Sequence, residues 1–255
     1  VLIYNNTIRS SASAIKFGTY TFGGCKNIRI INNRIYDTYR SAVSFQMMDG
    51  NVVEDIIIDS LRAINTGNVF FFRLGERKKG RVGTMKNIQI SNIYAEVPAG
   101  KPDASYPYEG PIEHMPRNIS PAVIVGLPQA CIKNLSFQNI EIHYPGGADS
   151  NYAKIDLSQL DSIPELPSKY PEFSMFKELP AWGFYIRHVR NIHMENIRLF
   201  TNKIDFRKAI ILDDVQECRF KNSHIGVAKS NITANDASMV YQNNCKDIKF
   251  EPNPK

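Results

Sequence analysis

The chain repeats one short pattern seven times. In each copy apolar residues alternate with variable ones, a polar residue follows, and a turn is expected. The copies are VLIYNNTI, NIRIINNRI, DIIIDSLRA, NIQISNIYA, NLSFQNIEI, NIHMENIRL and ECRFKNSHI. Alternation with a period of two is typical of β-strands. Self-similarity at a regular spacing is typical of a solenoid, in which each repeat buries its apolar face against the next.

Asparagine occupies the expected turn in six of the seven copies. The seven positions are Asn5, Asn32, Ser60, Asn92, Asn139, Asn196 and Asn222. Asparagine tolerates the left-handed backbone region, and its side chain can hydrogen-bond to the equivalent residue of the adjacent repeat. The shorter intervals between these positions are 27, 28, 32 and 26 residues, whereas two are stretched to 47 and 57. We therefore predict insertions at about residues 97–119 and 145–181 over one face, with a short helical turn within 154–177.

A second family of strand-like segments alternates with the first. These segments are AIKFGT, AVSFQM, NVFFFRL, AVIVGL, GFYIRH and AIILDD. No window shows a sustained helical pattern of apolar residues. The sequence thus predicts an all-β fold in which residues 1–255 form one domain, a right-handed parallel β-helix of about seven or eight coils. A leucine-rich repeat is the main rival, but it has a shorter period and a leucine consensus that this chain lacks.

Composition narrows the classes of protein that need to be considered. Hydrophobic residues make up 43% of the chain, which excludes a disordered protein. No apolar stretch is long enough to cross a bilayer, and Val1 begins without the pattern of a signal peptide. The net charge of +6 fits an acidic partner but is spread along the chain. We expect a monomer with no nucleic-acid partner and no cofactor. The four widely spaced cysteines are expected to be free and buried, and the histidines show no metal-binding spacing.

Three segments resemble motifs of the family 28 glycoside hydrolases, the polygalacturonase-like β-helices. The segment AIKFGTYTFGGCKNIRIINN is similar to that family's "GISIGS" strand and the "GG..NI.I.N" stretch after it. SAVSFQMMDG resembles its "GVRIKT..G" strand, and NVFFFRL resembles its "PI.I.Q" strand, so the motif-level likeness spans about residues 14–76. The coil pattern extends it over nearly the whole chain, closest to a divergent bacterial branch. The resemblance implies a right-handed β-helix that hydrolyses a pectin-like, uronate-containing polysaccharide by inversion, in an extracellular or periplasmic location.

The chain departs from that family at its catalytic positions. The two aspartate-bearing motifs of the family have no counterpart here, its histidine falls on Ser13, and its arginine and lysine fall on Ser44 and Gln46. No family catalytic residue can therefore be carried over. Two explanations stay open: the chain is the C-terminal portion of a longer enzyme, or it belongs to a branch with a rebuilt or lost active site.

Alternation along the second strand family predicts two outward columns on the face where the resembled family binds polysaccharide. The first is Lys16, Ser44, Phe70, Ile124, Tyr185 and Ile211, and the second is Gly18, Gln46, Phe72, Gly126, Arg187 and Asp213. Exposed aromatic rings can stack on sugars, and arginines can bind uronate carboxylates. The candidate substrate-binding residues are Lys16, Gln46, Phe70, Phe72, Arg73, Arg77, His114, Trp182, Tyr185 and Arg187. The alternative is that the insertions pack over these rings as a satellite core.

Glycoside hydrolysis needs a pair of carboxyl groups. The candidates are Asp49, Glu76, Glu109 and Glu113, the last two on the proline-stiffened first insertion. The alternative for each is a surface carboxylate. Three other functions stay open: a non-catalytic carbohydrate-binding β-helix, a polysaccharide lyase that uses Lys16 or Arg187 with calcium at Asp213–Asp214, and a structural fibre.

Overall fold

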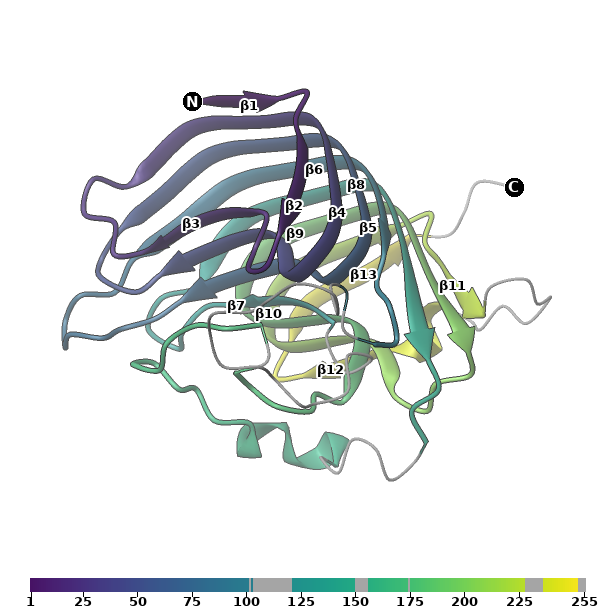
Figure 1. The fold of residues 1–255 in the computed structure, drawn as a ribbon. Helices are drawn as coiled ribbons and strands as arrows, with labels where there is room; N and C mark the ends of the chain where they lie inside the picture. Colours follow the sequence, from purple (N-terminus) through teal and green to yellow (C-terminus); the bar gives the residue numbers. More distant parts are fainter. Residues whose placement is uncertain (101, 103–120, 150–155, 174, 228–235, 252–255) are drawn as a thin grey trace.

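The computed structural model describes residues 1–100, 102, 121–149, 156–173, 175–227 and 236–251 (Figure 1). Most of the described chain is β-structure, with very little helix. Its strands are β1 (Leu2–Tyr4), β2 (Thr7–Ser10), β3 (Ile15–Thr19), β4 (Cys25–Met47), β5 (Val52–Leu74), β6 (Thr84–Glu96), β7 (Ala122–Val125), β8 (Ile132–Gly146), β9 (Ala181–Lys203), β10 (Lys208–Lys221), β11 (His224–Val227), β12 (Val240–Asn243) and β13 (Lys246–Glu251). Two short 3₁₀ helices are η2 (Leu157–Ser162) and η3 (Asp236–Met239).

The named strands pair only in parallel. The main path through the sheet is β1-β4-β5-β6-β8-β9-β10-β12, and the short strands β2, β3, β7, β11 and β13 attach beside it. Figure 1 shows the long strands lying side by side and bending together, so successive passes of the chain stack on one another. Parallel strands need long connections between them, which the repeat supplies. The predicted all-β class with parallel strands is confirmed.

The register aligns apolar residues of successive strands into columns that form the core. One column consists of Ile28, Ile56, Ile88, Leu135, Ile192 and Cys218. All are buried, and burial of each large aliphatic side chain contributes about 1.5–3 kcal/mol to stability. A file of aromatic rings also runs through the interior. Its members are Phe17, Phe45, Phe72, Phe70, Phe137 and Phe184, with neighbouring ring centroids 5.1 to 6.0 Å apart.

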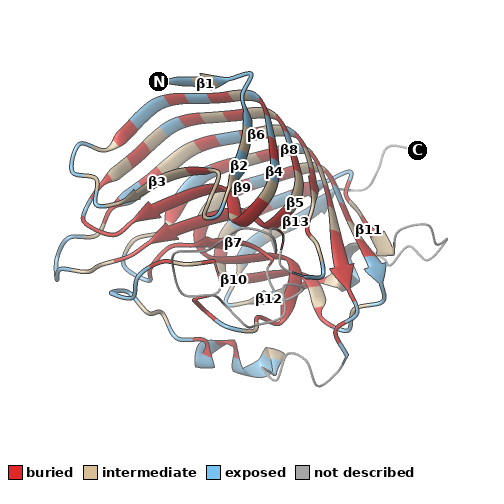
Figure 2. Ribbon diagram, viewed as in Figure 1, coloured by how far each residue is buried: buried red, intermediate tan, exposed pale blue. Residues whose placement is uncertain are grey.

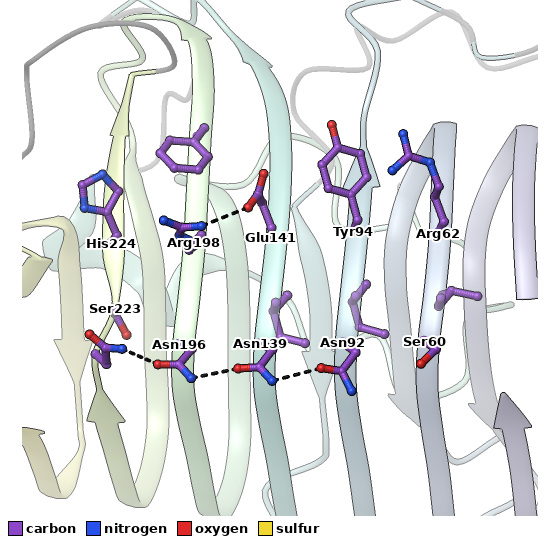
Figure 3. A pocket seen from close by; sticks show the side chains of 15 residues that line it. Ser60, Arg62, Asn92, Tyr94, Asn139, Glu141, Asn196, Arg198, Ser223 and His224 are labelled. Carbon is purple, nitrogen blue, oxygen red and sulfur yellow. Dashed lines mark hydrogen bonds and ion pairs between the residues drawn. The ribbon is translucent and has the colours of Figure 1, made fainter. Parts of the chain in front are cut away.

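All seven predicted turn residues adopt the left-handed conformation, with φ between 51° and 56°. Their side chains also form the predicted ladder. The Asn139 amide donates to Asn92 Oδ1 at 2.9 Å, and the Asn196 amide donates to Asn139 Oδ1 at 2.8 Å (Figure 3). Where serine interrupts the asparagines at position 60, the neighbouring Asp59 accepts the hydrogen bond from Asn92 at 2.8 Å.

A second ladder, which the sequence analysis did not predict, lies five residues before the first. Its left-handed residues are Asn27, Asp55, Asn87, Asn134, Asn191, Glu217 and Asp247. Within it the Asn134 amide donates to Asn87 Oδ1 at 2.9 Å, and the Asn191 amide donates to Asn134 Oδ1 at 3.0 Å. At least two bends per repeat, each at a residue with positive φ, therefore bring the strands back into register.

The second insertion folds back onto the face built from β5, β7, β9 and β10. It contains η2, so the predicted helical turn is confirmed, and Asp156 caps this helix by accepting from the Ser158 backbone N–H at 2.9 Å. The insertion forms a second apolar cluster against the strands. This cluster comprises Phe71, Val123, Val125, Leu160, Ile163, Phe173, Met175, Phe176, Leu179, Ala181, Tyr185 and Ile211. Figure 2 shows β7 in red, and the end of β5, the start of β9 and most of the first half of β10 are likewise buried. The satellite-core alternative is thus confirmed for this insertion, whereas the first insertion lies mostly outside the described residues.

The predicted outward columns are wrong by one residue at β5 and β7. The observed columns are Lys16, Ser44, Phe71, Val123, Tyr185 and Ile211, and Gly18, Gln46, Arg73, Val125, Arg187 and Asp213. Three consecutive phenylalanines in β5 and the apolar run of β7 carry no alternation that marks which residue faces inward. Pairing with β4 decides it, and that pairing shifts at a bend, where Thr38 lies beside Thr66 but Ser41 lies beside Asn68.

The cysteines follow the expected pattern in part. All four are free, and Cys25 and Cys218 are buried, but Cys131 and Cys245 are only partly covered. Cys218 lies beside Ile192, as predicted. A search of the described residues finds no helix with the length and apolar character that a membrane span requires.

Candidate functional site

The face predicted to bind polysaccharide is divided into two regions. Under the second insertion, β5, β7, β9 and β10 are covered. Around β3 and the ends of β4 and β5, charged and aromatic side chains reach the surface. We call this second region the open end, and define it by the partly or fully exposed Lys16, Tyr20, Arg77 and Tyr170 and by Asp49, which is buried and pairs with Arg77.

Lys16 and Tyr170 form one contact across the open end. The Lys16 Nζ donates to the Tyr170 hydroxyl at 3.1 Å and lies 5.2 Å from the centre of its ring. Tyr170 is 49% exposed. Just after β3 in the sequence, Tyr20 is 75% exposed and Phe22 is 60% exposed, and their ring centroids are 4.5 Å apart. Exposed rings of this kind give flat apolar surfaces beside a cation.

Asp49 and Arg77 form a second contact there. Arg77 Nε donates to Asp49 Oδ1 at 3.0 Å, its Nη2 pairs with Oδ2, and the same Nη2 donates to the Thr19 carbonyl at 3.1 Å. The hydrogen bond from Arg77 keeps the pKa of the Asp49 carboxyl below its usual value. Asp49 is therefore ionised at neutral pH, which suits a base and excludes a proton-donating acid.

Glu76 stabilises the turn that follows β5 through hydrogen bonds to its side chain. One of its carboxylate oxygens accepts from the Gly80 backbone N–H, and the other accepts from the Gln129 amide at 3.1 Å. Both described candidates for a catalytic carboxylate thus have partners within the chain. The other two, Glu109 and Glu113, and the predicted binding residue His114 lie outside the described residues.

Arg73 and Arg187 lie under the second insertion, where a substrate carboxylate would not reach them. Arg187 pairs with Glu165 through Nη2 at 2.8 Å and with Asp213 through Nε at 2.9 Å. Arg73 is fully buried; it donates to the Gly126 carbonyl at 2.8 Å and to the Glu165 backbone carbonyl. Burial lowers the pKa of Arg73 to about 10. The expectation that both guanidinium groups face an open substrate surface is wrong, because they are buried and attach the insertion to the strands.

His188 joins the same cluster from β9. Its Nε2 lies 2.9 Å from Glu165, and its Nδ1 lies 2.6 Å from Asp214, which Arg190 also contacts at 2.9 Å. Carboxylates only accept, so the doubly protonated imidazolium suits both contacts. Burial opposes the charged ring, but the two carboxylates outweigh it and raise the pKa of His188. No sequence signal pointed to Glu165, since the insertion has no periodicity that places it.

Five more of the predicted sugar-binding side chains are buried, so the expectation that they face a sugar was wrong; they are Gln46, Phe70, Phe72, Trp182 and Tyr185. Phe70 and Phe72 belong to the aromatic file of the core. Trp182 is 2% exposed and packs edge-on against Tyr144, with ring centroids 5.6 Å apart. Tyr185 is covered by the insertion, and burial raises the pKa of its phenol. Gln46 is buried and donates to the Ser44 hydroxyl at 2.9 Å. Large aromatic area favours burial wherever a neighbouring segment can supply it.

The adjacent aspartates Asp213 and Asp214 face different partners. Asp213 pairs with Arg187 and accepts from the Asn243 amide at 2.8 Å, whereas Asp214 contacts His188 and Arg190. Among the residues with described positions, no group of three or more His, Cys, Asp and Glu side chains is arranged to hold a metal ion. Comparisons with protein families, with curated proteins and with solved structures find no match to this chain.

Proposed function

We propose that this chain is a right-handed parallel β-helix of about seven or eight coils that hydrolyses glycosidic bonds in a uronate-containing polysaccharide, in an extracellular or periplasmic location. The parallel register and the left-handed turns in every repeat support the helix. The resemblance of residues 14–76 to family 28 glycoside hydrolases supports the substrate class.

The open end carries the proposal. Lys16 and Arg77 place two cations beside the exposed rings of Tyr170 and Tyr20. An acidic sugar needs both features, because its carboxylate pairs with a cation and the C–H face of its ring packs on an aromatic surface. The Arg77 side chain is 28% exposed while it pairs with Asp49, so part of it is accessible to a ligand.

Hydrolysis with inversion requires an acid and a base whose carboxyl groups are roughly 6.5–9.5 Å apart. Asp49, kept ionised by Arg77, has the protonation state of the base. The first insertion carries Glu109 and Glu113 and connects β6 to β7, a strand that pairs with β5 and β9. We assign the acid to one of these two glutamates.

A second candidate function is binding of the same polysaccharide without hydrolysis. One observation favours it: Asp49 and Glu76, the described carboxylates near the open end, both have partners that do not depend on substrate.

The test is release of reducing ends from polygalacturonate and other acidic plant glycans, alongside a binding measurement on the same glycans. Hydrolysis that is abolished by Glu109→Gln or Glu113→Gln, but not by Glu217→Gln on the exposed second ladder, supports the enzyme. Binding that weakens in Lys16→Ala without any product supports the second candidate. Products with an unsaturated, ultraviolet-absorbing end would show elimination instead. Absence of both binding and products would overturn both functions.

A further inference from the structure

A groove crosses the stacked strands on a part of the surface that shares no residue with the open end. Its volume is about 810 Å³, and it runs over β5, β6, β8, β9 and β11. Figure 3 shows two parallel rows of side chains in it. The inner row consists of Ser60, Asn92, Asn139, Asn196 and Asn222, and the outer row consists of Arg62, Tyr94, Glu141, Arg198 and His224.

The inner row offers hydrogen bonds at regular intervals. Each ladder amide uses one N–H and one oxygen lone pair for its neighbours, as Asn139 does with Asn92 and Asn196. An asparagine side chain has two N–H donors and two oxygen lone pairs, so one N–H and one lone pair of each ladder residue are not used within the ladder. Adjacent strands are about 4.8 Å apart, and the groove therefore presents paired donors and acceptors at that repeat. Hydroxyl groups, which donate and accept, match such a surface.

The outer row adds a ring surface and cations. The Arg62 guanidinium carbon lies 4.4 Å from the centre of the Tyr94 ring, which orients both groups. Arg62 is exposed, and among the described residues its guanidinium contacts the Tyr94 ring and forms no ion pair. Its N–H donors are thus available to a ligand carboxylate.

Glu141, in the middle of the outer row, already has cationic or polar neighbours. One of its oxygens lies 2.9 Å from His143 Nε2, and the other lies 3.6 Å from Arg198. The rings of His143 and Phe200 have centroids 5.1 Å apart, and Phe200 and His224 follow at 5.5 Å. With two arginines and one glutamate, the outer row keeps an excess of positive charge even with its histidine neutral.

From these features we propose that the groove is a second binding site for an extended, uronate-containing oligosaccharide, which lies across the strands with its hydroxyl groups on the asparagine ladder and a carboxylate on Arg62. The inference rests on the proposed function for the chemical class of the ligand, but not for its place on the molecule. A polymer bound here would be retained while the open end engages another stretch of it, which raises the effective concentration of substrate.

The test uses a hexamer of galacturonic acid as the probe, with a neutral maltohexaose as comparison. Binding is followed by calorimetry and by the side-chain amide NMR signals of Asn92, Asn139 and Asn196. We expect the acidic hexamer to shift these signals, and Arg62→Ala and Tyr94→Ala each to weaken that binding about five- to tenfold. Arg219→Ala is the matched control, since it removes an exposed arginine from a different outward column of the sheet.

The proposal is overturned if saturating acidic hexamer leaves the ladder signals unmoved, if Arg62→Ala binds as tightly as Arg219→Ala, or if maltohexaose binds the groove as well as the acidic hexamer does. Failure of the proposed function is seen separately. In that case Lys16→Ala changes neither hexamer stoichiometry nor product release, while the ladder signals still respond through Arg62.

Discussion

The Glu165 side chain connects the second insertion to the strands, so Glu165→Gln should loosen that insertion. The carboxylate lies 2.8 Å from Arg187 and 2.9 Å from His188. Glutamine keeps the shape and one acceptor but removes the negative charge, while Asp213 and Asp214 remain beside Arg187 and His188.

The expected cost follows from the partial burial of the cluster. Breaking a fully buried ion pair costs about 3–5 kcal/mol, whereas an exposed pair is worth about 0–1 kcal/mol. The Glu165 side chain is 26% exposed and its two partners are 8% or less. We therefore expect a loss of about 2 kcal/mol, which raises the fraction of molecules with an opened insertion about 30-fold.

Native-state hydrogen exchange measures this opening directly. The backbone amides of Gln159 and Ile163 donate to carbonyls within the insertion at 2.9 Å, and they should exchange about 30-fold faster in Glu165→Gln. Glu178→Gln is the control, because Glu178 lies on the same insertion and forms no ion pair in the described part of the chain. Equal exchange in Glu165→Gln and wild type, or equal acceleration in both variants, would refute the reasoning.

The same contact makes the insertion sensitive to pH in both directions. The pKa of His188 is raised on folding, so its contribution is complete below its unfolded pKa of about 6.5 and is lost as the pH rises through the folded pKa. Burial acts to raise the pKa of Glu165, but contacts with His188, Arg187 and Arg73 lower it overall. Its contribution is therefore present above its unfolded pKa of about 4.3 and is lost as the pH falls. Protection should peak between these limits, and the alkaline loss should shrink in Glu165→Gln.

Three further predictions concern the rest of the fold. Asn139→Ala should destabilise the protein by about 2–3 kcal/mol in urea unfolding, because it removes two ladder hydrogen bonds and places alanine at a φ of 55°. Asn139→Gly should lose less stability, because glycine adopts this φ without the backbone cost. Phe71→Ala should cost about 3–5 kcal/mol in the same assay through the cavity left beneath the insertion. Iodoacetamide should label the partly exposed Cys131 before Cys218, because the Cys218 thiol is buried and that burial raises its pKa.

The turns could be predicted because their cause is local. A residue such as Asn139 or Asn196 adopts positive φ by virtue of its own side chain, and the same residue type recurs at every copy of the bend. The second ladder was missed because glutamate and aspartate replace asparagine in several of its copies, which hides the recurrence.

The facing of the site residues could not be predicted in the same way. Phe70, Phe71 and Phe72 are equally apolar, and a shift of one residue moves each to the opposite side of the strand. Only pairing with β4 fixes which of them faces the core. The contact between Arg73 and Glu165 joins residues 92 positions apart, and no local pattern encodes it.

The buried arginines also explain why substrate binding is expected at the open end and not along the whole face. Arg73 and Arg187 occupy the same outward column, separated by Val125, and the charge of Arg187 helps to lower the pKa of Arg73. Two buried cations at this spacing need a neutralising group, because an unpaired buried charge is strongly destabilising. Asp213 forms an ion pair with Arg187, and the Glu165 carboxylate is close enough to interact with both Arg73 and Arg187. The insertion therefore supplies the carboxylate that neutralises the arginines of the strands it covers. A substrate that displaced it would expose Phe71 and remove Glu165 from both arginines. Binding beside Lys16 and Arg77 carries neither cost.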